Sequence, residues 1–486
     1  MDSYDILDFY NLVSVWALGT LIIFFISAID DFFIDIVYWV RRAYRYLFNK
    51  TYKVFNINIL KAQVEKRVAI MVPAWREDDV IAQMLETNIK YLDYKKYVFF
   101  VGVYKNDAAT NAEVDKVAAK YKQVQKVVVP HDGPTCKADC LNWVIQHIFL
   151  YEKENKKDFD FIVYHDAEDV IHPLELLLFN YMIRKKDFIQ IPVRALERDS
   201  MNWVSGIYMD EFAESHGKDL VVRGVLCGIV PSAGVASCFS KKAIKRLAKD
   251  NDGIVFNSDS LTEDYDISYR LAKYKIKQIF ADFKIDVGFA KNIYSATEKS
   301  RKVQSIAVAE YFPSKLWTAV RQRTRWNIGI FYQSASRLTW EGGFFNKYYF
   351  FRDRKGIVVN FLALPSYLLL FTLVGLSIGY QFFGLPRFDP NFPLWIFYSN
   401  VFFFLFRIFS RVYFTAESYS LKQGLLGIPR IFVANLINFL STFRATYIYT
   451  KSKIQGKAIA WDKTQHEYPS MEALKKAEEV VKKTTI

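Results

Sequence analysis

The 486-residue sequence is 52% hydrophobic and 17% aromatic, and 24% of its residues are charged. So much apolar sequence excludes a disordered chain, and its concentration at the two ends argues against an ordinary soluble enzyme. The net charge of +14 suits contact with anionic lipid, nucleotide phosphate or nucleic acid. The four cysteines show no C-x-x-C spacing, which excludes a disulfide scaffold and makes zinc an unfavourable interpretation.

The first apolar run, residues 12–29, is uncharged and long enough to cross a hydrocarbon core about 30 Å thick. A signal peptide would need a basic start and a small-residue cleavage site, whereas this start is acidic. We therefore expect a retained anchor. Basic residues dominate from Arg41 to Arg67, with Glu65 as the one acid, which predicts an outside N-terminus and a cytoplasmic chain after Arg41.

Two later uncharged runs, 356–383 and 390–406, predict a transmembrane hairpin. A further stretch, 424–449, is interrupted by Pro429 and Arg430, which favours a helix in the interface plane and three spans rather than four. The sequence thus divides into an N-terminal transmembrane anchor (1–40), a basic juxtamembrane segment (41–66), a cytoplasmic domain ending in interfacial helices (67–350), a transmembrane hairpin (351–410), an interfacial or fourth membrane helix (411–450) and a cytoplasmic tail (451–486).

The cytoplasmic segment alternates short apolar runs with helical periodicity. This rhythm predicts an α/β fold with parallel strands and with ligands at the carboxyl ends of the strands. Neither a dinucleotide-binding glycine pattern nor a P-loop is present. The expected strands are 68–72, 98–103, 127–129, 159–164 and 188–193, with a helix over 138–148.

Polar clusters follow three of these strands: PAWRE at 73–77, YKND at 104–107 and HDAED at 165–169. The acids of the last cluster would repel one another unless a cation or proton intervenes. Oxygen ligands suit Mg²⁺ or Mn²⁺, and such an ion often accompanies a bound phosphate. A solvated acidic turn is the alternative interpretation.

Three further clusters carry chemical groups. Thr262-Glu263-Asp264 precedes a helix, either as a helix cap or with Asp264 as a general base. QRTRW at 322–326 offers two cations and an aromatic plane for a diphosphate and a sugar, or else forms a basic helix on a membrane surface. Lys137 follows a Gly-Pro turn at a helix start, where backbone N–H groups favour anions.

The order Asp107, Asp166-x-Glu168, Thr262-Glu263-Asp264 and Gln322-x-x-Arg325-Trp326, between membrane anchors, resembles glycosyltransferase family two. Within that family the sequence is most similar to a membrane branch linked to phage adsorption, as far as about residue 470. The stretches that carry this closer resemblance are HDAEDVIHPLEL, GPTCKADCLN, IQIPV, PSAGVASCFS, SLTEDYDI, RDRKG (352–356) and AWDKTQHEYP.

The resemblance implies a GT-A (Rossmann-like) domain, a nucleotide-sugar donor, Mg²⁺ or Mn²⁺, and an inverting single displacement. Glu168 stands where many relatives have a second Asp, with Asp169 as a substitute ligand. Residue by residue, the resemblance assigns the nucleotide sugar to Pro73, Trp75, Glu77, Asp107, Lys137, Asp166 and Arg325, the metal to Asp166 and Glu168, catalysis to Asp264 with Glu263, the acceptor to Gln322, Trp326 and Glu263, and a candidate gating loop to Trp461, Lys463 and Thr464.

The expected protein is a multi-pass enzyme of the bacterial inner membrane. It would polymerise an N-acetylhexosamine, with N-acetylmannosamine suggested by the closer resemblance, from a UDP-sugar into an exported polysaccharide. Three spans are few for a conduit, so self-association or an outer-envelope export partner is expected. Nucleic acid is not expected as a partner, because the basic residues flank membrane segments.

Two alternatives remain: a single-sugar transferase acting on a lipid-linked acceptor, and a catalytically silent receptor or scaffold. Relatives in the phage-adsorption branch continue into a module that senses cyclic di-GMP, whereas this sequence ends at Ile486. The expectation is that regulation was lost or comes from another protein.

Overall fold

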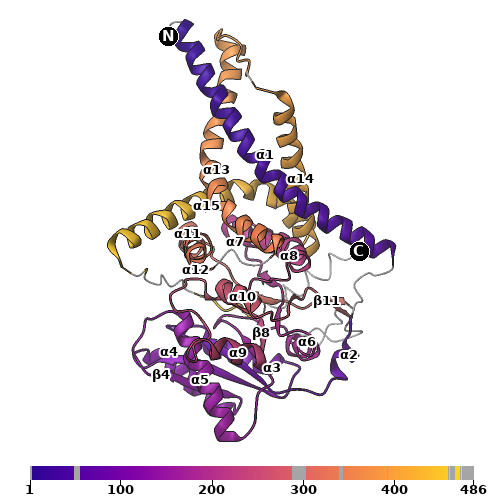
Figure 1. Cartoon of the computed structure of the whole chain (residues 1–486), viewed down its shortest axis with the longest axis vertical. Coiled ribbons are helices and arrows are strands. Elements are labelled where there is room, and N and C mark those ends of the chain that lie inside the picture. Colours follow the sequence, from indigo (N-terminus) through magenta and orange to yellow (C-terminus); the bar gives the residue numbers. More distant parts are fainter. Residues whose placement is uncertain are drawn as a thin grey trace.

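The computed structural model describes residues 3–48, 55–286, 303–338, 343–390, 392–457, 459, 466–470 and 472. They form an α/β domain from which long helices project on one side (Figure 1). This confirms the expected fold class.

The centre of the domain is a seven-stranded sheet in the order β4-β3-β2-β5-β8-β6-β9. The expected parallel strands are present, but the sheet is mixed, because β8 runs antiparallel to both β5 and β6. Ser237, at the start of β8, pairs with the last residues of β5 and β6, so the chain enters the sheet from its carboxyl edge. The strands are β2 (Val68–Pro73), β3 (Tyr97–Tyr104), β4 (Val124–Val129), β5 (Phe161–Tyr164), β6 (Phe188–Gln190), β8 (Ser237–Ser240) and β9 (Gln278–Phe280).

The run expected as one strand over 188–193 is divided. It forms β6 and a separate strand β7 (Val193–Ala195), which pairs with β12 (Val308–Glu310) outside the main sheet. Pro192 lies between them and has no N–H to donate to a strand ladder. This division brings Glu310 next to the strand ends of the main sheet.

Helices cover both faces of the sheet. The central strand β2 is therefore buried on both sides, with Ile70 in one hydrophobic core and Met71 in the other. The first core holds residues of α3 (Ile81–Tyr91), α4 (Ala108–Lys120) and α6 (Glu175–Met182). The second holds residues of α5 (Lys137–Asn155), α9 (Lys241–Lys249) and α10 (Glu263–Lys273).

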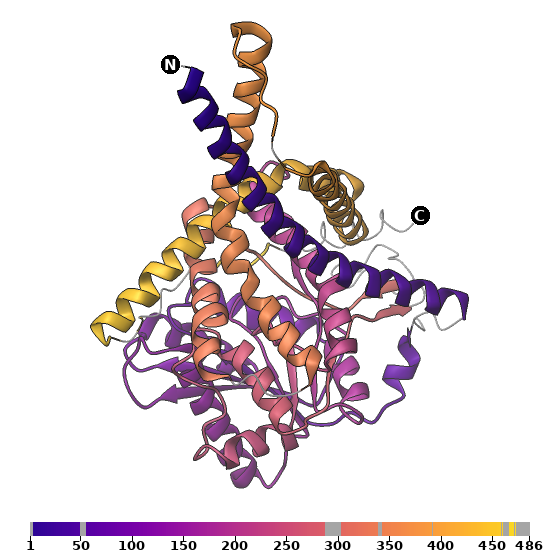
Figure 2. The ribbon, with the colours of Figure 1, turned by 45° about the horizontal axis from the view of Figure 1, so that its top comes forward.

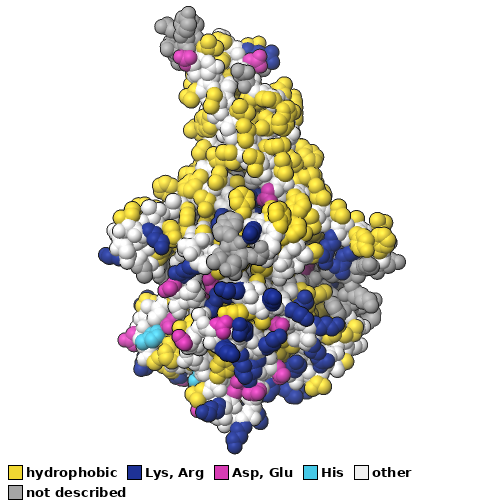
Figure 3. All heavy atoms as spheres, viewed as in Figure 1, with side chains coloured by type: hydrophobic (Ala, Val, Ile, Leu, Met, Phe, Trp, Pro, Cys, Tyr) yellow, Lys and Arg dark blue, Asp and Glu magenta, His cyan; other side chains and the backbone are white. Residues whose placement is uncertain are grey.

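Four helices among the described residues are long and apolar enough to cross a membrane, namely α1 (Ser3–Leu47), α13 (Phe344–Phe383), α14 (Leu394–Ser418) and α15 (Leu421–Gln455). The first three project away from the domain, whereas α15 lies across their base (Figures 1 and 2). Hydrophobic side chains cover the projecting part, and charged side chains gather on the domain below it (Figure 3). The interfacial placement of 411–450 remains a prediction.

Shorter helices connect the domain to the projecting part. The continuous run of α7 (Trp203–Glu214), the π-helix η1 (Ser215–Asp219) and α8 (Leu220–Leu226) lies between them, as does α11 (Leu316–Asn327), which packs on α15 (Figure 1). The remaining elements are β1 (Phe55–Asn56), α2 (Ile57–Lys61), β10 (Lys284–Asp286), β11 (Val303–Ser305), the π-helix η2 (Ile328–Gln333) and α12 (Ser334–Arg337).

Candidate functional site

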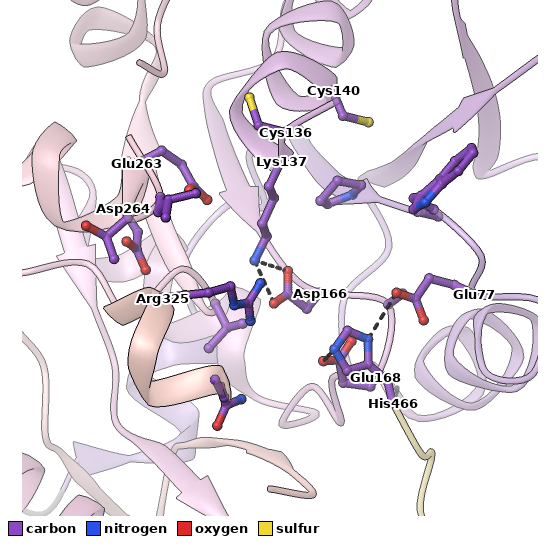
Figure 4. Close-up of a pocket in the computed structure, with 18 of the residues that line it drawn as sticks. Glu77, Cys136, Lys137, Cys140, Asp166, Glu168, Glu263, Asp264, Arg325 and His466 are labelled. Atoms are coloured by element: carbon purple, nitrogen blue, oxygen red, sulfur yellow. Dashed lines mark hydrogen bonds and ion pairs between the residues drawn. The ribbon is translucent and has the colours of Figure 1, made fainter. Parts of the chain in front are cut away.

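A pocket lies where the carboxyl ends of β2 and β5 meet the starts of α5 and α10 (Figure 4). Side chains from widely separated parts of the chain line it, and helix α11 closes one side. Those expected from the sequence are Pro73, Trp75, Glu77, Lys137, Asp166, Glu168, Glu263, Asp264, Gln322, Arg325 and Trp326.

Asp166 is the first carboxylate of the acidic turn after β5. Its two oxygens lie 2.6 and 2.7 Å from Lys137 Nζ, at the first residue of α5. Burial alone would lower the pKa of the Lys137 ammonium, but Asp166 and Glu263 raise it above its ordinary value. Lys137 is therefore a fixed cation inside the pocket, as the binding of a diphosphate requires.

His165 holds the acidic turn in place from beneath. Its ring nitrogens lie 2.7 Å from Asp169 Oδ2 and 2.7 Å from Glu175 Oε1, and all three side chains are fully buried. Asp169 Oδ2 also accepts the backbone N–H of Asp166 at 3.0 Å. Asp169 does not line the pocket, so it is a support for the turn rather than the substitute ligand suggested from the sequence.

Glu168 points into the pocket and meets a residue that the sequence analysis missed. His466 lies 3.2 Å from Glu168 Oε1 through Nε2 and 3.0 Å from Glu77 Oε1 through Nδ1 (Figure 4). The other oxygen of Glu168, Oε2, is buried, and the described residues supply no hydrogen-bond partner for it. Burial raises the pKa of Glu168 to about 8, although His466 opposes the shift.

Glu310 is a second pocket acid that the sequence analysis missed. Burial, with Asp169 and Glu168, raises its pKa well above the ordinary value. The only signal for His466 was its place in the AWDKTQHEYP stretch, and Glu310 had none, because a short edge strand outside the main sheet delivers it.

Glu263 and Asp264 form the first turn of α10 and face the pocket. Asp264 Oδ1 accepts the backbone N–H of Tyr265 at 2.7 Å, and Tyr164 donates to Glu263 Oε1 at 3.2 Å. Burial and the neighbouring Asp264 raise the pKa of Glu263 to about 7, and burial also raises that of Asp264. The Thr262 hydroxyl forms no hydrogen bond with the residues that the structure describes, so the side-chain cap considered for it is not formed.

Glycine at position 234 allows the loop before β8 to reach Asp264. Gly234 has φ +76°, and a Cβ there would stand 2.7 Å from Asp264 Oδ2. A side chain at this position would displace the carboxylate, so the loop and the turn fit only with glycine.

Gln322, Arg325 and Trp326 reach the pocket from α11. The ring of Trp326 stands edge-on to Tyr208, with centroids 6.2 Å apart. Gln322 Oε1 is buried, and within the described part of the chain it has no hydrogen-bond partner. This wall thus offers a cation, an aromatic ring and an unsatisfied acceptor.

Asp107 does not line the pocket. Its carboxylate caps α4 at Thr110 N (3.4 Å) and accepts the backbone N–H of Arg76 at 2.6 Å. Arg76 has φ +55°, so Asp107 fixes the turn that carries Trp75 and Glu77. The candidate gating residues Trp461, Lys463 and Thr464 lie outside the described residues.

The pocket carboxylates are candidate ligands for a divalent cation. Within the described ranges no three His, Cys, Asp or Glu side chains are grouped to hold a metal ion by themselves. Asp166 and Glu168 nevertheless present hard oxygen donors to one pocket, and among the residues that the structure describes none forms a hydrogen bond to the buried Glu168 Oε2. The pair fits a cation whose other ligands come from a bound diphosphate.

Comparison with known proteins gave a family and two close relatives. Residues 161–383 match glycosyl transferase family group 2. The chain is 42% identical over 471 residues to bacteriophage adsorption protein B of Escherichia coli K12, covering 94% of this chain and 63% of that protein. Bacteriophage N4 adsorption protein B of E. coli O157:H7 gives the same values. The chain therefore spans less than two thirds of the length of these relatives.

Among solved structures, mannosyltransferase PcManGT from Pyrobaculum calidifontis, in complex with GDP-Man and Mn²⁺, is 16% identical with a TM-score of 0.49. It covers 87% of this chain and 99% of its own. Glucosyl-3-phosphoglycerate synthase from Mycobacterium tuberculosis is 15% identical with a TM-score of 0.25, covering 39% and 61%.

Proposed function

We propose that this chain, whose residues 161–383 match glycosyl transferase family group 2, is an inverting, metal-dependent glycosyltransferase of a bacterial inner membrane, with its catalytic domain in the cytoplasm. The observation that carries the proposal is the convergence of Lys137, Asp166, Asp264 and Arg325, which lie far apart in the sequence, on one pocket.

The donor is a UDP-sugar, with its diphosphate between Lys137 and Arg325. Both cations stabilise the negative charge that develops on the diphosphate as the sugar leaves. Asp166 and Glu168 would hold a divalent cation, which adds positive charge beside the same oxygens when bound. Asp107 supports this end of the pocket indirectly, through the turn that carries Glu77.

Asp264 is the general base. It takes the proton of an acceptor hydroxyl, whose oxygen forms a bond to the anomeric carbon of the donor sugar. The bond from that carbon to the diphosphate oxygen breaks, and UDP leaves with the electron pair. One displacement inverts the anomeric centre. Burial raises the pKa of Asp264, which moves the carboxylate toward the range in which a base is effective near neutral pH.

The acceptor lies against α11, where Trp326 offers a ring face to a sugar and Gln322 an unsatisfied oxygen. We assign the acceptor as a growing N-acetylhexosamine polymer, with N-acetylmannosamine as the sugar, that is exported to the cell surface. An exported glycan would also suit a relative named for bacteriophage adsorption.

The test is UDP release by detergent-purified protein with a panel of UDP-sugars and Mg²⁺ or Mn²⁺. One sugar should support release, and Asp264→Asn should lower the rate by about 10²–10⁴-fold while UDP still binds. Asp115→Asn, on the surface of α4, is the matched control and should keep the wild-type rate. Release by Asp264→Asn at the wild-type rate, or no UDP binding by the wild type, would contradict the proposal.

Sizing the product separates the two transferase candidates. A ladder of sugars supports the polymer, whereas a single added sugar on a lipid-linked acceptor supports the alternative transferase.

A further inference from the structure

Helix α13, the first arm of the projecting hairpin, touches the helix that carries the candidate base. The contact is made by Asp353, within the RDRKG stretch at 352–356, for which the proposed chemistry has no role. Asp353 lies near the end of α13 that packs on the domain, and its side chain is 16% exposed.

Asp353 is surrounded by donors from two other helices. Arg223 of α8 binds it with two parallel hydrogen bonds, Nη1 to Oδ1 and Nη2 to Oδ2, both 2.9 Å long. From α10, Tyr265 donates to Asp353 Oδ2 at 2.5 Å and Tyr269 to the same oxygen at 3.2 Å. Arg223 Nη2 also donates to the Tyr269 hydroxyl at 2.6 Å, which closes the network.

The network is buried and contains a cation, Arg223. Burial alone would lower the pKa of the Arg223 guanidinium, but Asp353 raises it well above its ordinary value, so the cation persists. Paired charge-assisted hydrogen bonds hold their groups in a narrow range of geometries. The start of α10 is thus attached to α13 by directional bonds rather than by apolar packing alone.

Tyr265 joins this network to the pocket. Its hydroxyl donates to Asp353, and its own backbone N–H donates to Asp264 Oδ1 at 2.7 Å. On the other side, Ser268 Oγ donates to the Asp264 carbonyl at 3.1 Å and accepts the backbone N–H of Ser232 at 2.7 Å. The first turn of α10 is held between the Ser232–Gly234 loop and α13, with Asp264 at its centre.

We propose that Asp353 is a positioning residue for the base Asp264, acting through Tyr265, so that the membrane hairpin sets the orientation of the catalytic carboxylate. The inference rests on the proposed function for the role of Asp264, but the attachment of α10 to α13 can be tested without it. A base must lie within hydrogen-bond reach of its proton, and small displacements are costly in rate.

The kinetic test compares Tyr265→Phe, Asp353→Asn and the double variant in UDP release. Tyr265→Phe keeps the backbone N–H and loses only the hydroxyl. We expect kcat to fall about tenfold while the KM for the donor stays within about twofold. The fall in kcat of the double variant should be smaller than the product of the falls in the two single variants, because both substitutions break the same connection between Asp353 and Asp264.

The matched control is Tyr348→Phe. Tyr348 lies on α13, as Asp353 does, but its hydroxyl donates to Asp30 of α1 and not to α10. This variant should keep the wild-type kcat. A Tyr265→Phe variant with wild-type kcat, a rise in KM alone, or multiplicative effects in the double variant would overturn the positioning role.

Hydrogen exchange gives a readout that needs no turnover. In Tyr265→Phe and in Asp353→Asn, amides of residues 261–268 should exchange faster, while those of β2 and β3 keep the wild-type rate. Unchanged exchange at 261–268 would overturn the inference even if the enzyme is active. Faster exchange in a protein without activity on any UDP-sugar would leave the attachment standing and count against the proposed function instead.

Discussion

Two regions of this molecule bury charge, and they do so in opposite ways. The first is the pocket, and the second is a charged belt, which we define as Asp210, Glu214 and Lys218 on α7 and η1 with their partners on α1, α14 and α15. Belt carboxylates face cations: Glu214 lies 2.9 Å from Arg411 and 3.0 Å from Lys218, and Lys218 lies 2.7 Å from Asp35.

In the pocket, acids outnumber the described basic groups. Six carboxylates line the pocket, those of Glu77, Asp166, Glu168, Glu263, Asp264 and Glu310. The basic groups that line it are those of Lys137, Arg325 and His466. Burial raises the pKa of several of these acids. In the belt, Lys218 and Arg411 overcome burial and lower the pKa of Glu214 to about 2, whereas burial still raises that of Asp210 to about 7 although Arg430 opposes the shift.

The difference separates structural from functional charge. Matched buried pairs hold elements together, and here they join α7 and η1 to α1, α14 and α15. Unmatched buried carboxylates cost stability, and clustered shifted groups in a cleft are typical of sites that bind a ligand or perform chemistry.

The largest expected effect on stability comes from breaking the belt. Lys218→Met leaves Asp35 without its ammonium partner and Glu214 with one cation fewer, in side chains that are almost fully buried. We expect a loss of about 3–5 kcal/mol, seen as a lower melting temperature in detergent.

Lys120→Met is the control for that substitution, since Lys120 pairs with Glu86 on the surface of the domain. Its melting temperature should match the wild type, because exposed pairs contribute little. Equal shifts of the melting temperature in Lys218→Met and Lys120→Met would contradict the expectation that buried pairs of the belt stabilise the fold more than exposed pairs do.

A smaller effect follows from acid. Burial lowers the pKa of His216, in η1, to about 4, against about 6.5 in an unfolded chain. As the pH falls below 6.5, His216 becomes protonated in the unfolded state, whereas in the folded state it becomes protonated only near pH 4. Stability therefore declines across that window, by about 2 kcal/mol at pH 5.

His216→Asn isolates this contribution, because the amide does not titrate and can accept from Val193 N, which lies 3.0 Å from His216 Nδ1. Melting curves at pH 7 and pH 5 should show a smaller acid shift in the variant than in the wild type. Identical shifts would show that His216 is not held neutral.

The smallest expected effect has the opposite sign. Glu168→Gln removes a carboxylate whose buried Oε2 has no hydrogen-bond partner among the described residues. We expect the fold to gain about 1 kcal/mol while metal-dependent UDP binding weakens. A melting temperature below that of the wild type would contradict this expectation, because Glu168 would then stabilise the fold as the belt residues do.

Much of this arrangement could be predicted from the sequence, since apolar runs ended by polar clusters located β2, β3 and β5 and the acids that follow them. Local patterns could not predict contacts made by distant segments. The direction of β8 depends on the path of α7 and α8, Glu310 arrives on a separate pair of strands, and His466 returns from beyond α15.

Asp107 illustrates the same limit in another way. The family resemblance assigned it to the nucleotide sugar, but its carboxylate is used by backbone N–H groups of α4 and of the turn at Arg76. A carboxylate at a strand end can serve either role, and only the fold of the neighbouring turn decides between them.

The most direct test of the pocket as a nucleotide-sugar site is calorimetric titration of UDP into the purified protein, with and without Mn²⁺, in the wild type and in Asp166→Asn. The account predicts that Mn²⁺ strengthens UDP binding at least tenfold in the wild type, about 1.4 kcal/mol, and hardly at all in the variant. Equal affinities with and without Mn²⁺ in the wild type, or an undiminished effect of Mn²⁺ in Asp166→Asn, would contradict it.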